Sequence, residues 1–558
     1  MRFLTPAAAW GPWGIAAAVL VPPLARFVLP AFAAAGEMIA RRAALAAFAW
    51  AAAAAVLVAL LPDQVRFVGD FLLRQGTVEV IEQPAVLFPQ ALPLDVFLHY
   101  TVPLQITATH LLDANGAARL LGAIEAALLA ALAVAFARAL ALRGAAACAC
   151  AAVVLFGGYL GMFTGFSKAF AEMCVLIALI GVSAVRALRT GRGLLPLGIA
   201  AAIAIALHRS ALGVLPAVAL VAWLTLRRAG AGAWRRADVL LGIGLPVATL
   251  AIMGPRIAGT VIGTDAAIHF APADVRAQGG MLRAAFAGAR AFDLASLVLM
   301  LSPLALAIPP LAVFGRLPRR LPGRFAELWV LELLAIPFVL VMPFLHPAQG
   351  LFRDWDDFAA TGVALSLVAA WLVGETLRAA PRFAWLAVAV VLGVASPAVQ
   401  WLLVHADATR GLERVRAFVT EPPPRTPAER GTTWDYLGIR NYRLERYAEG
   451  VAAFTRAVET EPSPRILQEW AVTATMAGDL RTAQTAYHRL LAGSPDNSLG
   501  WLGLAAVSMR LRDVPEAKRA ALGLRRLVPQ SPEAAHILDE IARYEALQAD
   551  SLRRAAGR

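Results

Sequence analysis

Residues 43–61 read AALAAFAWAAAAAVLVALL, an apolar stretch without one charged side chain. A helix of about 20 apolar residues is long enough to cross the hydrocarbon core of a bilayer. Arg41 and Arg42 come directly before the stretch, and Pro62 and Asp63 follow it. Because short basic loops stay cytoplasmic, we predict a membrane-spanning helix whose first residues lie on the cytoplasmic side.

Similar stretches recur along the first three quarters of the chain. Of 558 residues, 59% are hydrophobic and only 16% are charged, and the mean hydropathy is +0.65, which indicates a polytopic membrane protein with a soluble appendage. Residues 1–35 contain Pro22, Pro23 and Pro30 and are predicted to be a kinked extra span or an interfacial segment. The predicted fold is therefore all-α, with a polytopic helical membrane domain of about 11–12 spans over residues 1–405. The eleven main windows lie near residues 43–61, 116–137, 145–162, 168–185, 194–208, 211–226, 238–253, 294–313, 325–345, 358–376 and 383–404.

Charged residues separate by sign when the chain is threaded through these spans. Short arginine clusters collect on one face, near residues 41–42, 186–192, 227–236, 316–324 and 378–382. Because short basic loops stay cytoplasmic, this face is predicted to be cytoplasmic, and the aspartates of the opposite face are predicted to lie outside. An odd number of spans then places the chain after residue 405 outside as well. The net charge of +13 lies largely in these loops, beside lipid headgroups, so no nucleic-acid partner is predicted. The opposite face receives eleven of the twelve aspartates before residue 408: Asp63, Asp70, Asp95, Asp113, Asp265, Asp274, Asp293, Asp354, Asp356, Asp357 and Asp407.

Two outer loops, residues 62–115 and 254–293, are predicted to be long, and loops of that size are usually functional. In the first loop, residues 65–73 fit a short amphipathic helix on the bilayer surface. A Pro-rich linker over residues 406–430 contains EPPPRTP at 421–427, which is predicted to be stiff polyproline II.

The last 128 residues, 431–558, carry an internal repeat. The tetratricopeptide pattern is matched at nearly every offset by Trp434, Leu437, Gly438, Phe454, Ala457 and Pro462. Pro495 and Pro529 close two further repeats, and a polar last helix near 533–556 caps the array. We predict an α-solenoid of three repeats plus a capping helix, whose surface binds an acceptor or a protein partner.

Asp70 is the first candidate catalytic residue. It follows Gly69 a few residues beyond the first span, where a partly desolvated carboxylate at headgroup level has the raised basicity that a general base needs. The alternative is an interfacial helix in which Asp70 pairs with Arg74 at i and i+4.

The second candidate is the polar cluster Arg353-Asp354-Trp355-Asp356-Asp357, between two spans. Three carboxylates within four residues repel one another, so Arg353, a divalent metal ion or a bound cationic group is expected to stabilise them. Spacing alone identifies no metal ligand here and no certain cofactor. The alternative is a solvated turn in which Trp355 anchors the membrane interface.

The third candidate is a set of cations at outer helix ends: Lys168, His208 and Arg209. Arg209 and Lys168 fit a clamp on a lipid-linked phosphate, the guanidinium as a bidentate donor and the ammonium as a point charge. The alternative is that each side chain extends to the lipid headgroups. Glu125 and Glu172 lie within spans and are interpreted as helix-packing or inward-facing polar groups.

The plan of spans, an early Gly-Asp in the first outer loop and an external repeat tail resembles the GT-C superfamily of polyprenyl-phosphate-sugar-dependent glycosyltransferases. Closest in plan are its bacterial members with such tails and the animal transmembrane-and-tetratricopeptide O-mannosyltransferases. GFSKAF at 165–170 is similar to a Gly-Tyr-x-Glu-x-Tyr-like stretch of the bacterial members, and RDWD at 353–356 is similar to their Arg-Asp-Trp-Asp loop. Two positions depart from the family: a single Asp70 replaces paired acids, and Lys168 stands where an acid is expected.

The resemblance implies a GT-C-like membrane domain in a bacterial-type cytoplasmic (inner) membrane, with the repeat domain extracytoplasmic. It implies inverting transfer of a sugar from a polyprenyl-phosphate donor to a glycan or protein acceptor, with Asp70 as the base. Substrate binding would fall to Arg74, Lys168, His208, Arg209, Arg353, Asp354 and Asp356, with Asp354 or Asp356 orienting the acceptor.

Two alternatives stay open at the level of sequence. An O-antigen-type polymerase or ligase would use a lipid-diphosphate donor and arginines of a large outer loop, and Arg256, Arg276, Arg283 and Arg290 lie in residues 254–293. A non-catalytic membrane scaffold would only display its repeats.

Overall fold

The computed structural model describes residues 2–65, 74, 90–314, 324–347 and 350–556. Within these residues every regular element is a helix and no β-strand occurs, which confirms the predicted all-α class. The chain forms two compact units, residues 1–411 and 412–558, and this division falls inside the predicted linker.

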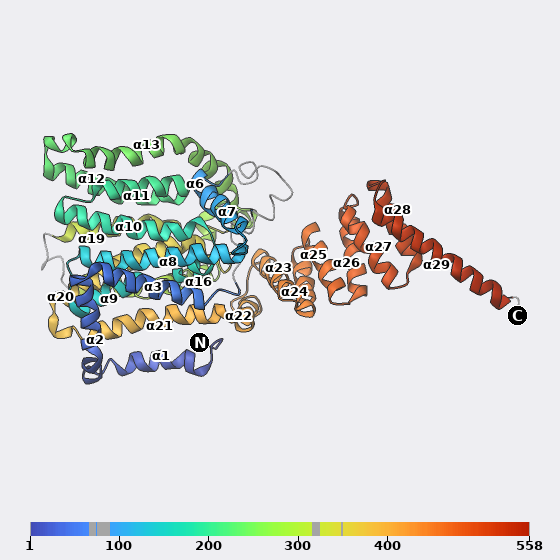
Figure 1. The fold of residues 1–558 in the computed structure, drawn as a ribbon, viewed down its shortest axis with the longest axis horizontal. Coiled ribbons are helices and arrows are strands. Elements are labelled where there is room, and N and C mark those ends of the chain that lie inside the picture. The colour runs from blue at the N-terminus through green and yellow to red at the C-terminus, as the bar shows by residue number, and fades with distance from the viewer. Residues whose placement is uncertain (1, 66–73, 75–89, 315–323, 348–349, 557–558) are drawn as a thin grey trace. The chain divides into compact units, whose positions relative to one another are not determined.

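Residues 1–411 form a bundle in which long helices run side by side (Figure 1). In the described part of the chain, eight helices are long and apolar enough to cross a membrane, or up to ten if two bent pairs each count as one span. This first unit is therefore a multi-pass membrane domain. Its main helices are α1 (Pro6–Ala18), α2 (Pro22–Arg41), α3 (Ala43–Leu60), α8 (Ala114–Ala139), α9 (Gly144–Leu155), α10 (Ala169–Thr190), α11 (Leu194–Leu207), α12 (Leu215–Ala229), α13 (Ala237–Gly259), α16 (Arg290–Leu301), α17 (Ile308–Phe314), α19 (Phe325–Val341), α20 (Ala359–Ala379) and α21 (Leu386–Ala406).

Each of the eleven predicted windows overlaps one of these helices, but two windows are broken rather than straight. The window at 145–162 bends by 60° between α9 and η2 (Gly158–Thr164), and the window at 294–313 bends by 93° after α16. The two breaks touch: a Cβ on Gly157 would lie 2.3 Å from the carbonyl oxygen of Leu301. Glycine at 157 and 158 permits this backbone approach, and Pro303 follows the end of α16.

The predicted outer loop at residues 254–293 is largely helical, which corrects the sequence interpretation. Helix α13 runs on through Gly254 and Pro255 and continues as the π-helical segment η5 (Thr260–Phe270). Short helices α14 (Ala273–Ala277) and α15 (Met281–Ala284) follow. The abundance of Gly and Ala favoured a loop there, whereas neighbouring helices and local π adjustments allow a membrane helix to tolerate Gly and Pro.

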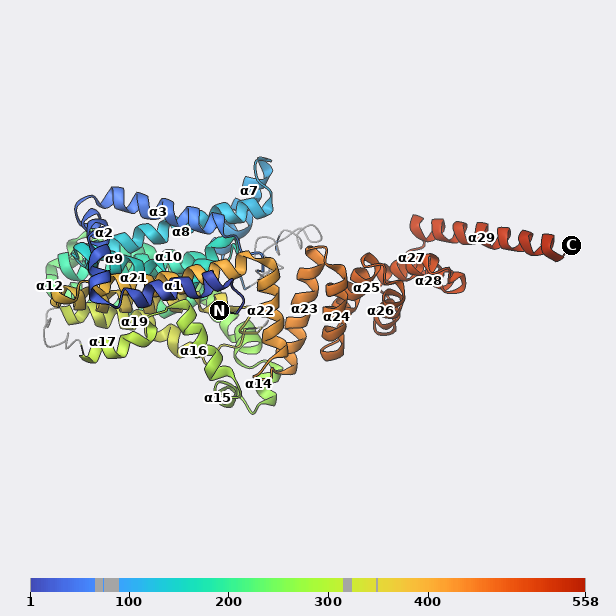
Figure 2. The same cartoon turned by 90° about the horizontal axis from the view of Figure 1, so that it is seen from below.

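The first outer loop contains α6 (Pro93–Val96), η1 (Phe97–Thr101) and α7 (Val102–Ala108) in its described part. The predicted surface helix at residues 65–73 lies outside the described residues, apart from Val65. At the N-terminus, both views draw α2 crosswise to the long helices at one end of the bundle (Figures 1 and 2).

Close helix packing depends on glycine at the crossing of α11 and α13. A Cβ on Gly198 would lie 2.0 Å from the carbonyl oxygen of Gly242, and a Cβ on Gly242 would lie 2.5 Å from that of Leu194. Small residues allow membrane helices to approach at backbone distance.

We therefore expect Gly242→Ala to destabilise the membrane domain by about 1–3 kcal/mol, because the added methyl forces the helices apart. Gly244→Ala on the same helix is the matched control, since nothing lies within 4 Å of its Cβ position. Thermal unfolding of the purified variants measures both. Equal melting temperatures for the two variants would contradict the close crossing.

Ion pairs gather at both ends of the bundle. At the arginine-rich end, Arg189 binds Glu327 (2.7 Å) and Glu375 (3.3 Å), and Arg324 and Arg378 also pair with Glu375. This network ties α10, α19 and α20 together. The aspartate-rich end holds a second set of pairs, which surrounds the candidate site.

The second unit is a stack of helix pairs, the repeat-like solenoid that the tail pattern predicts. Pro462, Pro495 and Pro529 fall between successive pairs. A Cβ on Gly438 would lie 2.6 Å from the Phe454 ring, so a small residue is needed at that helix crossing. The linker before it is less extended than predicted, because α22 (Ala408–Thr420) occupies much of it. The pairs are α23 (Pro427–Arg443) with α24 (Tyr447–Thr460), α25 (Pro464–Met476) with α26 (Leu480–Gly493), and α27 (Ser498–Arg510) with α28 (Val514–Leu527); α29 (Pro532–Ala556) follows.

Candidate functional site

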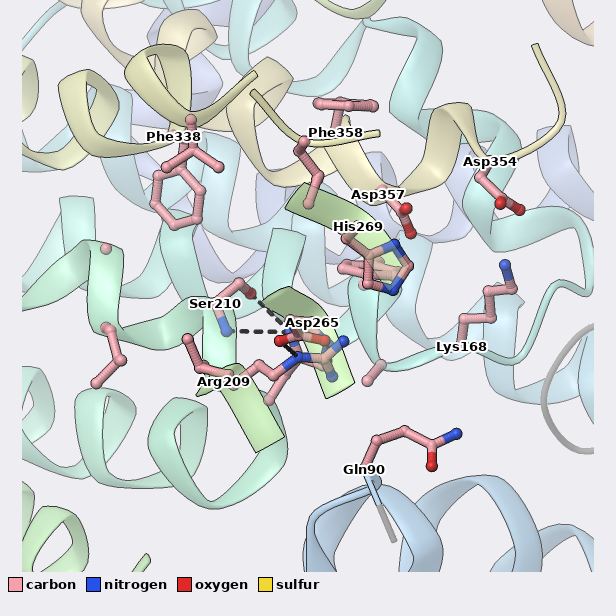
Figure 3. A pocket seen from close by; sticks show the side chains of 18 of the residues that line it. Gln90, Lys168, Arg209, Ser210, Asp265, His269, Phe338, Asp354, Asp357 and Phe358 are labelled. Carbon is pink, nitrogen blue, oxygen red and sulfur yellow. Dashed lines mark hydrogen bonds and ion pairs between the residues drawn. The ribbon is translucent and has the colours of Figure 1, made fainter. Parts of the chain in front are cut away.

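A cavity of about 530 Å³ opens at the aspartate-rich end of the membrane domain (Figure 3). That volume is in the range of small-molecule binding sites. Its walls come from α6, the start of α10, the 3₁₀-helix η3 (Arg209–Val214), η5, the end of α19 and the 3₁₀-helix η8 (Trp355–Phe358). Its ionisable lining residues are Arg74, Asp95, Lys168, His208, Arg209, Asp265, His269, Asp354 and Asp357.

Lys168 is placed by a sharp turn between η2 and α10. Gly165 and Ser167 adopt left-handed backbone angles, with φ of 111° and 48°, and Lys168 then caps α10. Its Nζ donates a 2.7 Å hydrogen bond to Oδ2 of Asp356, whose side chain is 0% exposed. Two segments far apart in sequence are thereby joined by a buried ion pair at the cavity wall.

A second polar chain supports the same turn from behind. His99 on η1 is fully buried, and its ring nitrogens lie 3.1 Å from the hydroxyl of Ser167 and 3.1 Å from the carboxylate of Glu172. Glu125 shares a hydrogen bond with Glu172. Both glutamates face the protein interior, where they help to hold the residue before Lys168.

His208 and Arg209 lie where α11 ends and η3 begins. The Arg209 guanidinium pairs through Nε with Oδ2 of Asp265 on η5, and its Nη1 lies 3.3 Å from Nε2 of His208. No described residue hydrogen-bonds its Nη2, so one edge of this guanidinium remains open at the cavity. Figure 3 shows Arg209 and Asp265 together at one side of the cavity.

Arg74 forms a buried ion pair with Asp95. Its Nη2 and Nη1 lie 2.8 and 3.1 Å from the two carboxylate oxygens of Asp95. This bidentate pair fixes the start of α6 at the cavity rim. Asp70, the predicted base, lies outside the described residues.

Within residues 353–356, one side chain lines the cavity and the others lie in the protein interior. Asp354 lines the cavity, whereas Arg353 and Asp356 are buried and are not among its lining residues in the described chain. Trp355 is also buried, at 5% exposure, and packs edge-on against Phe166 and Trp401. The solvated turn with Trp355 as an interface anchor is therefore wrong.

The cavity thus collects five predicted substrate-binding residues, Asp357 of the predicted polar cluster, and three residues that were not predicted as site residues. The five are Arg74, Lys168, His208, Arg209 and Asp354; the three are Asp95, Asp265 and His269. Each of these aspartates is among the eleven that were predicted to lie outside the membrane, so their shared side was the feature of the sequence that could have indicated them. No pattern in the sequence indicated His269.

The wall beside Arg209 is apolar. Pro337, Phe338 and Val341 of α19 line it, followed by Met342 and Leu345. Leu340 of the same helix is not a lining residue and is 63% exposed. The cavity therefore has charged groups at one side and hydrocarbon at the other.

His346, directly after this wall, adds no positive charge at neutral pH. Burial and the nearby Arg290 lower its pKa to about 4. The described residues contain no group of three or more His, Cys, Asp or Glu side chains arranged to hold a metal ion. Cys148, Cys150 and Cys174 are free and buried.

No protein-family model matches this chain, and no curated protein matches its sequence. The assignment of function therefore rests on the geometry of the cavity.

Proposed function

We propose that this protein is a membrane glycosyltransferase, which moves a sugar from a polyprenyl-phosphate donor to an acceptor outside the cytoplasm. The observation that carries the proposal is the division of the cavity into a charged side and an apolar side. A lipid-linked phosphate sugar needs cations for its phosphate and polar groups for its sugar, which suit the charged side. Its first isoprene units need the apolar side.

The cations suit a phosphate that gains charge as it leaves. Arg209 offers an open guanidinium edge, and Lys168 is held at the same cavity by Asp356. Fixed donors aimed at developing charge stabilise a transition state without reorganising. Because phosphate is a good leaving group, the reaction needs a base for the acceptor hydroxyl but no general acid.

Inverting transfer is one displacement. The acceptor oxygen attacks the anomeric carbon, the bond from that carbon to the phosphate oxygen breaks, and the hydroxyl proton passes to a carboxylate. Polyprenyl phosphate leaves with the electron pair.

The polymerase or ligase alternative is less well supported. Three of the four arginines that favoured it donate to backbone carbonyl oxygens: Arg256 to Ala91, Arg276 to Ala271, and Arg290 to Pro343 and Leu345. None of the four lines the cavity in the described chain. The three arginines that donate to carbonyl oxygens support helices and turns.

We assign the repeat domain to binding of the acceptor or of a protein partner, and the whole chain to a bacterial-type cytoplasmic membrane with this domain outside. Exposed groove-forming helix pairs are suited to peptide or protein ligands. Protease accessibility of residues 431–558 in sealed right-side-out vesicles tests the orientation. Protection there with cleavage in inverted vesicles would contradict it.

The function is tested with the full-length protein in liposomes that contain either a polyprenyl-phosphate sugar or a polyprenyl-diphosphate sugar. We expect consumption of the monophosphate donor, release of polyprenyl phosphate and labelling of an acceptor in added membranes. Consumption of the diphosphate donor alone would support the polymerase or ligase. Failure to bind or consume either lipid would support the scaffold.

A further inference from the structure

We infer that Asp357 is the carboxylate that removes the proton from the acceptor hydroxyl. This inference rests on the proposed function and adds the residue that performs its proton transfer. Asp357 belongs to η8, lines the cavity and is half-buried.

The other described carboxylates at the cavity are already engaged. Asp95 accepts two hydrogen bonds from Arg74. Asp265 pairs with Arg209 through Oδ2, and its Oδ1, which has no hydrogen-bond partner in the described chain, is buried. Asp354 is buried at 7% exposure and has an interaction partner. A carboxylate that is held in an ion pair stays ionised, and protonation would remove that pair.

Asp357 differs from all three. Among the described residues, no side chain or backbone group forms a hydrogen bond or an ion pair with its carboxylate. Figure 3 draws Asp357 among the side chains that line the cavity. Its oxygens are therefore available to a ligand.

The surrounding charges favour a base at this position. Burial and repulsion from Asp354 and Asp356 disfavour the negative charge of Asp357, whereas Lys168 and Arg209 attract that charge. Repulsion from neighbouring carboxylates favours uptake of a proton. The two cations then face the phosphate that leaves, so that proton removal and charge stabilisation occur on different walls of one cavity.

In the reaction, the acceptor O–H proton transfers to the Asp357 carboxylate as the oxygen bonds to the anomeric carbon. The carbon–oxygen bond to phosphate breaks, and the pair of electrons leaves with polyprenyl phosphate. The carboxyl proton of Asp357 is lost to water after product release, so the cycle needs no further reactant.

Asp357→Asn in the full-length protein tests the assignment. We expect kcat to fall by about 10²-fold or more, which is the usual contribution of a general base, with the acceptor KM unchanged. Asp357→Glu should restore part of kcat. The melting temperature should stay the same or rise, because the amide relieves repulsion from Asp354 and Asp356; a purely structural carboxylate would lower it.

The pH profile gives a second readout. In the parent protein, kcat/KM should fall as the base becomes protonated at low pH, and this limb should disappear in Asp357→Asn. Asp274→Asn, outside the cavity at the same end of the bundle, is the matched control and should behave as the parent. The charged or titratable groups that face Asp357 and remain in all variants are Asp354, Asp356, Lys168, Arg209 and His269.

Three results would overturn the assignment. Unchanged kcat in Asp357→Asn, together with loss of kcat in Asp70→Asn, would make Asp70 the base. A raised acceptor KM with full kcat would make Asp357 a binding residue for the acceptor. Absence of transfer by the parent protein would contradict the proposed function and the assignment together, whereas the first two results leave the proposed function intact.

Discussion

Lys168→Met is expected to destabilise the membrane domain severely, by about 3–5 kcal/mol, because it leaves a buried charge without its partner. Asp356 is 0% exposed, and the ammonium of Lys168 lies 2.7 Å from its Oδ2. Its other oxygen, Oδ1, is also buried and has no hydrogen-bond partner. Removal of the ammonium therefore leaves a buried carboxylate without the cation that it pairs with.

The measurement is thermal unfolding of the purified protein in detergent, together with its yield from membranes. The double variant Lys168→Met/Asp356→Leu should recover most of the lost stability, since replacing both partners by apolar groups is often neutral. Arg236→Met is the control in the same unit, because its pair with Asp238 is exposed and contributes little. Equal melting temperatures for Lys168→Met and Arg236→Met would show that the pair is not buried in the protein.

The helices of the membrane domain were predictable because few backbone conformations can cross a bilayer. A run such as residues 43–61 has to be helical if it crosses hydrocarbon, where every backbone polar group must be satisfied within the segment. Composition reveals such runs but not their continuity. Gly157 and Gly158 break one span, while Gly254 and Pro255 leave α13 continuous. The difference lies in what packs against each glycine, which the local sequence does not contain.

The pairing of charges was less predictable than their sidedness. Local spacing offered Asp70 as a partner of Arg74, and it gave no indication of Asp95, which pairs with Arg74 from 21 positions away. Lys168 and Asp356 are separated by 188 positions, so no rule based on spacing could join them. The threading of the spans placed these residues at the same end of the bundle. Only the packing of the helices determines which of the described carboxylates form ion pairs.

Arg209→Ala is expected to reduce sugar transfer by about 10²–10³-fold, the usual cost of removing one preorganised donor to developing charge. The guanidinium is fixed by Asp265 and has an open edge at the cavity, so a departing phosphate meets a donor that is already oriented. Arg209→Lys keeps the charge but loses the planar fork, and its rate should fall between those of the parent and Arg209→Ala. Arg276→Ala, which removes an arginine outside the cavity, should transfer at the parent rate.

A second substitution separates catalysis from mere support of the fold. Asp265→Asn weakens the hold on Arg209 but frees more of its guanidinium for phosphate, so the KM for the donor should fall while the precision of the site, and hence kcat, declines. In Arg209→Ala, by contrast, the donor KM should rise and kcat should fall together. Initial rates over a series of donor concentrations in liposomes measure both constants for each variant. If Arg209→Ala lowers only the melting temperature and leaves both constants unchanged, Arg209 serves to neutralise Asp265 and the phosphate must bind elsewhere.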